Sequence, residues 1–188
     1  MSASLPVSLK TTQNNETREK QRQYLTFTLG KEFFAVPISP IREIIEFQRL
    51  TEIPLSPPFL RGVINLRGAV VPVIDLSVRF GRLATDIGRR TCVIIVEIVV
   101  DNGLQSLGVL VDTVSAVVDI EPAQIEDRPG FGSGLRNDFV AGMLKLQDGF
   151  VVALDLDCIL STEELIQLVA STRIATKGNI PINGESQK

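Results

Sequence analysis

Short segments of alternating apolar and polar residues occupy the chain from residue 23 to residue 156. Residues 24–29 alternate strictly, a Gly30-Lys31 turn follows, and residues 32–38 return, which predicts an antiparallel hairpin. Three further hairpins are predicted over residues 60–76, 91–118 and 139–156, each with a glycine at its turn. About nine or ten short strands in successive hairpins, with few helices, predict a mainly β protein of closed or sandwiched antiparallel sheets.

The segment 39–46 fits two patterns. Ser39 can cap a helix and Pro40 suits its first position. Ile41, Ile44 and Ile45 have helical spacing, but β-branched residues also favour strands. A turn or two of helix is our first interpretation, and an isoleucine-rich strand is the alternative.

A second helix is expected near the C-terminus. Ser161 or Thr162 can cap it, Glu164 can reach back to the cap, and residues 165–169 carry an apolar stripe. The chain is polar at both ends. We therefore expect a folded domain at residues 23–171, between a disordered tail at residues 1–22 and a flexible tail at residues 172–188.

The predicted hairpin of residues 60–76 is the most distinctive stretch of the chain. Its arms are largely apolar on both faces, so both faces should be covered. Pro72 cannot donate a ladder hydrogen bond, which places its arm at a sheet edge or at a bulge. Asn65 and Arg67 are polar groups at the tip, next to Gly68. Arg67 either presents its guanidinium to a partner or only solvates the turn.

Length and composition fit a globular protein with one domain, or with two small domains that share a core. The 188 residues are 44% apolar, and the net charge of −3 gives no general attraction to nucleic acid. No apolar run approaches the roughly 20 residues that span a bilayer, and the N-terminus lacks the pattern of a leader. The sequence therefore predicts a soluble, cytoplasmic protein with no nucleic-acid partner and no direct membrane insertion.

Residues suited to catalysis or metal binding are scarce. The chain has no histidine, which excludes ordinary hydrolase triads and removes the commonest zinc ligand. Asp155 and Asp157 have the spacing of an Asp-x-Asp metal site, but we interpret them as a strand end because no ligand cluster accompanies them. Cys92 and Cys158 lie in apolar segments without CxxC spacing, and we expect both to be reduced and buried. No catalytic residue, metal or cofactor is predicted.

Two connections remain to be interpreted. The arginines of residues 77–90, at positions 79, 82, 89 and 90, are interpreted as solvated side chains of an exposed connection. The long loop of residues 121–138 places Phe131 among glycines, where it has nothing local to pack on. Phe131 either packs into the body of the domain or anchors a partner.

Several motifs taken together resemble the CheW family of bacterial chemotaxis proteins. RGVINLRG at residues 61–68 and VPVIDL at residues 71–76 are similar to the signature of that family. The family's order is also followed by FTLG at 27–30, IREI at 41–44, GVLVDTV at 108–114, and DLD at 155–157 before LSTEE at 160–164. The resemblance covers about residues 23 to 170, nearly the whole chain expected to be ordered.

The resemblance implies two five-stranded, SH3-like β-barrels packed on a shared hydrophobic core, with short helices that include a C-terminal one. It implies a non-catalytic adaptor that couples the cytoplasmic tips of methyl-accepting chemoreceptors to the regulatory, CheW-like domain of the histidine kinase CheA. Such an adaptor is cytoplasmic and is recruited to membrane-associated receptor arrays. A CheW-like scaffold of another kinase pathway, such as one for surface motility, fits the sequence equally.

Site residues carried over from the resemblance fall into two groups. The receptor-binding group comprises Ile41, Glu43, Ile44, Asn65, Arg67, Val114 and Val117, and the kinase-binding group comprises Arg61, Gly62 and Phe131. A receptor tip is a helical hairpin, so a groove with exposed apolar residues suits it, and a few charges set its register.

Two other classes of protein fit the residues less well. A small-barrel nucleic-acid binder needs basic strands interleaved with exposed aromatic residues, whereas this chain has one tyrosine, no tryptophan and a net negative charge. An enzyme that works with carboxylates alone is the weakest alternative.

Overall fold

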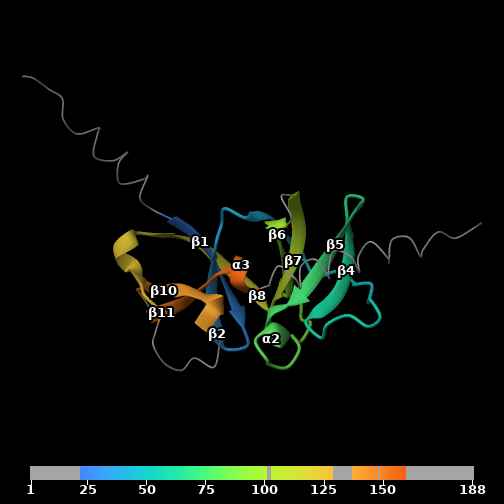
Figure 1. The fold of residues 1–188 in the computed structure, drawn as a ribbon. Coiled ribbons are helices and arrows are strands. Elements are labelled where there is room, and N and C mark those ends of the chain that lie inside the picture. The colour runs from blue at the N-terminus through green and yellow to red at the C-terminus, as the bar shows by residue number, and fades with distance from the viewer. Residues whose placement is uncertain (1–21, 101–102, 129–136, 148, 160–188) are drawn as a thin grey trace, which may run out of the picture.

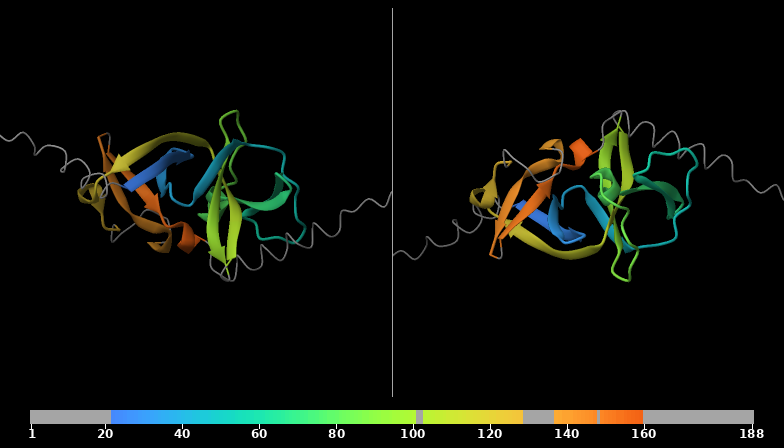
Figure 2. Two further views of the ribbon diagram at one scale, coloured as in Figure 1. Left: turned by 90° about the horizontal axis from the view of Figure 1, so that it is seen from above. Right: turned by 90° about the horizontal axis from the view of Figure 1, so that it is seen from below.

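The structure is a computed structural model that describes residues 22–100, 103–128, 137–147 and 149–159. Its strands form two sheets that lie side by side, each curled around a small apolar interior (Figure 1). Views from above and below show the same two units next to each other (Figure 2). The sheets are therefore described as a first and a second barrel.

The first barrel combines the beginning and the end of the described chain. Its strand order is β8-β1-β2-β11-β10-β9. The strands are β1 (Arg22–Leu29), β2 (Glu32–Pro37), β8 (Thr113–Ile120), β9 (Ile125–Glu126), β10 (Val140–Leu146) and β11 (Gly149–Leu154). The 3₁₀ turns η1 (Pro122–Gln124) and η2 (Asn137–Phe139) precede β9 and β10. The predicted hairpins β1–β2 and β10–β11 are confirmed, and β2 runs parallel to β11.

The second barrel is made of the middle of the chain, in the strand order β3-β6-β7-β5-β4. The strands are β3 (Ile41–Glu46), β4 (Leu60–Leu66), β5 (Ala69–Asp75), β6 (Cys92–Val100) and β7 (Gly103–Val111). Its interior contains Ile64, Val71, Val73, Val93, Ile95 and Leu110. The predicted hairpins β4–β5 and β6–β7 are confirmed, although the return arm of the second one divides into β7 and β8.

The largest apolar cluster lies between the barrels and takes side chains from both. The first barrel contributes Phe27 and Phe34, whose stacked rings have centroids 6.1 Å apart, and the second contributes Ile94 and Val109. The short helices α2 (Leu76–Arg79) and α3 (Leu156–Ile159) add apolar residues to the same cluster. The predicted pair of barrels on a shared core is confirmed, and the first barrel has the two-residue β9 in addition to five longer strands.

The first interpretation of residues 39–46 was wrong. Residues 41–46 form strand β3, which pairs with β6, so the isoleucine-rich strand was the correct alternative. Ile41 packs on the shared core and Ile45 on the interior of the second barrel. A short helix would have left the edge of β6 unpaired, so tertiary pairing overrides the helical signals of Ser39 and Pro40.

The β4–β5 hairpin turns where the sequence predicted, with Arg67 at φ 52° and Gly68 at φ 88°. Strand β5 lies between β4 and β7, so the edge position suggested by Pro72 is wrong. The pairing with β7 begins only at Val73, and the register irregularity of this hairpin lies between Leu60 and Gly62 of β4, not at Pro72. Pro72 is therefore tolerated because no ladder bond needs its missing N–H on the β7 side.

Several predictions fall outside the described residues or need correction. The expected C-terminal tail, the helix at residues 161–169 and Phe131 lie outside the described residues, as does the expected N-terminal tail except Arg22, which begins strand β1. Cys92 and Cys158 carry free thiols, but Cys92 is only partly buried and Cys158 is exposed, so their predicted burial was wrong. No helix within the described ranges is long and apolar enough to cross a membrane.

Candidate partner-binding surface

Glu43 and Arg67 meet across the opening of the second barrel. Arg67 Nη2 lies 3.0 Å from Glu43 Oε2, although β3 and β4 stand at opposite ends of the strand order. Asn65 Oδ1 accepts a hydrogen bond from the backbone N–H of Gly68 at 2.8 Å, which fixes the turn. The Arg67 side chain is 79% exposed even in this pair. The guanidinium is thus oriented by Glu43 while most of its surface stays free for a partner.

The apolar receptor-binding candidates lie on two edge strands, β3 and β8. Ile41 and Val114 pack against the same shared core. Ile44 pairs with buried Ile94, and Val117 pairs with buried Leu25. Paired residues of neighbouring strands point to the same face of a sheet.

Ile44 and Val117 therefore lie on the sheet faces that border the shared core. They remain 42% and 54% exposed. We call Ile41, Ile44, Val114 and Val117 the apolar margin. It continues the shared core to the surface. Ile41 and Ile44 share strand β3 with Glu43, although Glu43 pairs with Ile95 and therefore points to the face opposite that of Ile44.

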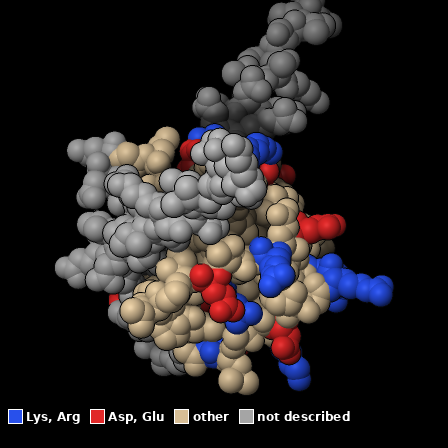
Figure 3. Space-filling view, turned by 90° about the vertical axis from the view of Figure 1, so that its right-hand side faces the viewer, with Lys and Arg blue, Asp and Glu red and all other residues tan. Residues whose placement is uncertain are grey.

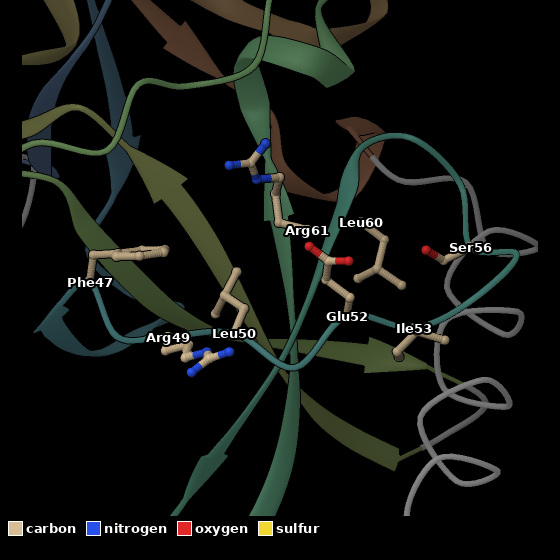
Figure 4. A pocket seen from close by; sticks show the side chains of 8 residues that line it. All are labelled: Phe47, Arg49, Leu50, Glu52, Ile53, Ser56, Leu60 and Arg61. Carbon is tan, nitrogen blue, oxygen red and sulfur yellow. The ribbon is translucent and has the colours of Figure 1, made fainter.

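The kinase-binding candidates Arg61 and Gly62 lie on β4, beside a hollow of about 500 Å³ (Figure 4). The hollow is lined by Phe47, Leu50, Ile53, Leu60 and Ser56, with Arg49, Glu52 and Arg61 as charged residues. The Arg61 side chain is about one-third exposed, and its Nε lies 3.9 Å from Asp75 Oδ2.

Gly62 has a clear role in the fold. Its φ is 142°, and a Cβ at this position would lie 2.5 Å from the carbonyl oxygen of Thr51. The backbone of Thr51 exchanges two hydrogen bonds with Val63 here, which brings the β3–β4 connection against β4. The close approach explains the glycine, and its predicted contact with a kinase stays a prediction.

Asp75 is a buried carboxylate at the end of strand β5. Its side chain has no exposed surface and accepts hydrogen bonds from the backbone N–H groups of Ser77, Val78 and Thr85 and from the Thr85 hydroxyl. These bonds begin helix α2 and hold the connection that follows it. An Asp at the end of a strand and before a helix is an N-cap signal that could have been read from the sequence.

Arg79 and Arg82 are not solvated side chains, which corrects the interpretation of this connection. Arg79 Nε donates to the carbonyl oxygen of Ile159 at 2.6 Å. Arg82 pairs with Glu32 and lies over the ring of Phe34, 5.8 Å from its centroid. Both arginines follow β5 of the second barrel, but these partners belong to the first barrel or to α3 beyond it.

Asp155 begins α3, because its Oδ1 accepts hydrogen bonds from the backbone N–H groups of Asp157 and Cys158. The pKa of the Cys158 thiol is raised, mainly by partial desolvation and to a smaller extent by its hydrogen bond to Asp155. A hydrogen bond to Glu97 likewise raises the pKa of Arg42. Within the described ranges, no three His, Cys, Asp or Glu residues are placed to hold a metal ion.

Charged side chains of both signs are interspersed on the face shown in Figure 3. Among the described residues on this face, the charged side chains form no single-sign patch of the kind that nucleic-acid binding requires. Exposed apolar residues at strand edges, together with a few oriented charges, are instead typical of a surface that binds protein. The fold and this surface define a double-barrel protein-binding module.

The sequence model of the CheW-like domain matches residues 23–164. The chain belongs to the CheW-like domain family.

Two relatives and one solved structure are similar to this chain over most of its length. "Chemotaxis protein CheW" of Klebsiella aerogenes is 33% identical over 144 residues, which are 77% of this chain and 84% of the relative. The protein of the same name from Rhizobium meliloti is 32% identical over 76% of this chain and 90% of the relative. The crystal structure of the scaffolding protein TtCheW from Thermoanaerobacter tengcongensis is 31% identical, with a TM-score of 0.66 over 74% of this chain and 88% of that chain.

Proposed function

We propose that this protein is a non-catalytic adaptor that couples the cytoplasmic tips of methyl-accepting chemoreceptors to the histidine kinase CheA. Its membership of the CheW-like domain family and the names of its relatives support a role in chemotaxis signalling. The observation that carries the proposal is that Glu43, which orients Arg67, shares strand β3 with Ile41 and Ile44 of the apolar margin. The adaptor works in the cytoplasm, is recruited to receptor arrays and needs no cofactor.

On the receptor side, the apolar margin receives the apolar stripe of a receptor helix. Ile44 and Val117 are exposed at the rim of the shared core, so a helix laid along them would remove apolar surface from water. Arg67, held by Glu43, fixes the register by pairing with a polar group of the receptor. Rim charges of this kind tune partner choice and association rate more than affinity.

On the kinase side, the hollow beside Arg61 is the binding surface. Its apolar lining and its exposed charges suit a protein contact, and it lies on the same barrel as Arg67 but on a different part of the surface. Phe131 is proposed as a further kinase contact from the family resemblance alone. Modest affinity at each contact suffices, because many copies in an array bind multivalently.

The test is co-sedimentation of the protein with receptor cytoplasmic fragments and the cognate kinase, combined with a measurement of kinase autophosphorylation. We expect the protein to enter the complex and to change kinase activity. If it neither enters the complex nor changes autophosphorylation, the adaptor function is wrong.

A matched pair of variants tests the receptor surface. We expect Arg67→Ala to weaken receptor binding while the free energy of unfolding changes by less than about 1 kcal/mol, because an exposed ion pair contributes little. Arg89→Ala, at an exposed arginine outside the proposed receptor-binding group, is the control and should bind normally. A large loss of stability in Arg67→Ala, measured by denaturant unfolding, would mean that Arg67 mainly supports the turn.

A further inference from the structure

The connection that follows β5 joins the two barrels through charged side chains. Arg79 reaches past the end of the first barrel and donates to the Ile159 carbonyl of α3. Its guanidinium carbon also lies 4.8 Å from the ring centroid of Phe59 and 5.2 Å from that of Phe139. Phe59 precedes β4 and Phe139 precedes β10, so one guanidinium contacts both sides of the junction.

Arg82, three residues further along the chain, makes a second connection. Its guanidinium pairs with Glu32 at the start of β2 and lies over the Phe34 ring of the shared core. The Arg82 side chain is 31% exposed and that of Glu32 is 56% exposed. The Arg82–Glu32 ion pair is partly screened by solvent. The contact of Arg82 with the Phe34 ring adds to it, because attraction between an arginine and an aromatic face strengthens where water is excluded.

The base of both arginines is held rigidly on the second barrel. Asp75 caps α2 and also binds Thr85 on the far side of the connection, which fixes both ends of the segment that carries Arg79 and Arg82. Arg61, beside the hollow, lies with its Nε 3.9 Å from this carboxylate. The connection is thus a fixed part of the second barrel that binds the first barrel from outside the shared core.

We propose that Arg79 and Arg82 are positioning residues that set the orientation of the two barrels and thereby the shape of the apolar margin. The margin takes Ile41 and Ile44 from the second barrel and Val114 and Val117 from the first, so its shape depends on that orientation. Apolar packing alone is non-directional, whereas a guanidinium that must reach a carbonyl and two rings permits few orientations. The consequence for receptor binding rests on the function proposed above.

The experiment measures the distance between the barrels without any partner. Spin labels are placed at Gln48→Cys and Lys145→Cys, two exposed positions on different barrels, in a background with Cys92→Ala and Cys158→Ser. The test variant is Arg79→Met with Arg82→Met, which keeps apolar bulk and removes both guanidinium groups. The control carries Arg89→Met with Arg90→Met, at exposed arginines of the same connection.

We expect one narrow distance distribution in the parent and in the control, and loss of that single peak, by broadening or displacement, in the test variant. Receptor-fragment binding should weaken only in the test variant. An unchanged distribution in the test variant would overturn the positioning role. A changed distribution with normal receptor binding would overturn the link to the apolar margin.

The test still decides the positioning role if the double variant does not fold or if the parent protein binds no receptor fragment. If the double variant does not fold, the milder variants Arg79→Lys and Glu32→Gln are measured in the same way, and each should broaden the distribution. If the parent protein binds no receptor fragment, the proposed function fails, while the distance measurement still decides the positioning role.

Discussion

Gly62 illustrates how one residue can be recognised from the sequence while its physical role comes from a distant segment. The family signature marks the position, but nothing near it in the sequence requires a glycine. The requirement comes from the Thr51 carbonyl, which occupies the space of a Cβ at residue 62. This glycine within a strand is therefore explained by a backbone contact rather than by a turn.

We expect Gly62→Ala to destabilise the fold by about 3 kcal/mol, because the new Cβ meets backbone and the residue must also keep a positive φ. Gly68→Ala is the control, since Gly68 has positive φ but a Cβ there would meet no atom within 4 Å. It should cost about 1 kcal/mol. Denaturant unfolding compares the two, and equal losses would show that φ alone decides the effect.

Arg67 and Asp75 show what residue patterns could not supply. The sequence located Arg67 at the tip of a hairpin but gave no partner for it, because Glu43 lies on a strand at the far end of the sheet. Asp75 ends strand β5, and two of its four hydrogen bonds, those from Thr85, depend on the path of the connection up to that residue. Contacts of this kind follow from the closure of the barrel.

At the scale of elements, β3 is where local signals and tertiary structure disagree. Ser39 and Pro40 are sound helix-start residues, and three isoleucines fit either period. The open edge of β6 decides the outcome, because five residues of β3 pair with it in a ladder that a helix cannot replace. Hairpins with clear turns, such as β4–β5, were predictable because the residue patterns of both strands and of the turn favour the same local structure.

The two faces of β3 should respond differently to substitution. Ile45 packs inside the second barrel, so we expect Ile45→Ala to cost about 2–4 kcal/mol of unfolding free energy. Ile44 is 42% exposed, so Ile44→Ala should cost less than about 1 kcal/mol.

Only Ile44→Ala, measured with folded protein, should weaken receptor binding. Thermal or denaturant unfolding together with receptor-fragment binding checks both expectations. If Ile45→Ala weakened binding more than Ile44→Ala while both remained folded, the apolar margin would be assigned to the wrong face.

At the scale of the whole molecule, the shared core makes the two barrels one folding unit. Each barrel has a small interior of its own, whereas the cluster between them is larger and takes residues from both. The chain also passes from the first barrel to the second and back, through β2–β3 and β7–β8. Neither barrel is therefore a separate segment of chain with a sufficient core.

We expect Phe34→Ala, in the middle of the shared core, to cost about 3–5 kcal/mol and to lower the stability of both barrels together. Native-state hydrogen exchange should show amides of β6 and β10 losing protection by the same free energy. Leu144→Ala, inside the first barrel, is the comparison and should cost about 2–5 kcal/mol. Two separate unfolding transitions in Phe34→Ala would show that the barrels fold independently.

The sequence by itself determined most of the strands, most of the turns, the absence of histidine chemistry and the family, because these depend on residue type and short-range period. Only the tertiary structure decided that residues 41–46 form a strand, that Glu43 holds Arg67, and that Arg79 and Arg82 connect the barrels. Such contacts join residues far apart in the chain, and the closure of two sheets around a common core selects them. Local patterns do not decide which distant residues come into contact, because a loop arginine looks the same in the sequence whether its side chain is solvated or binds the other barrel.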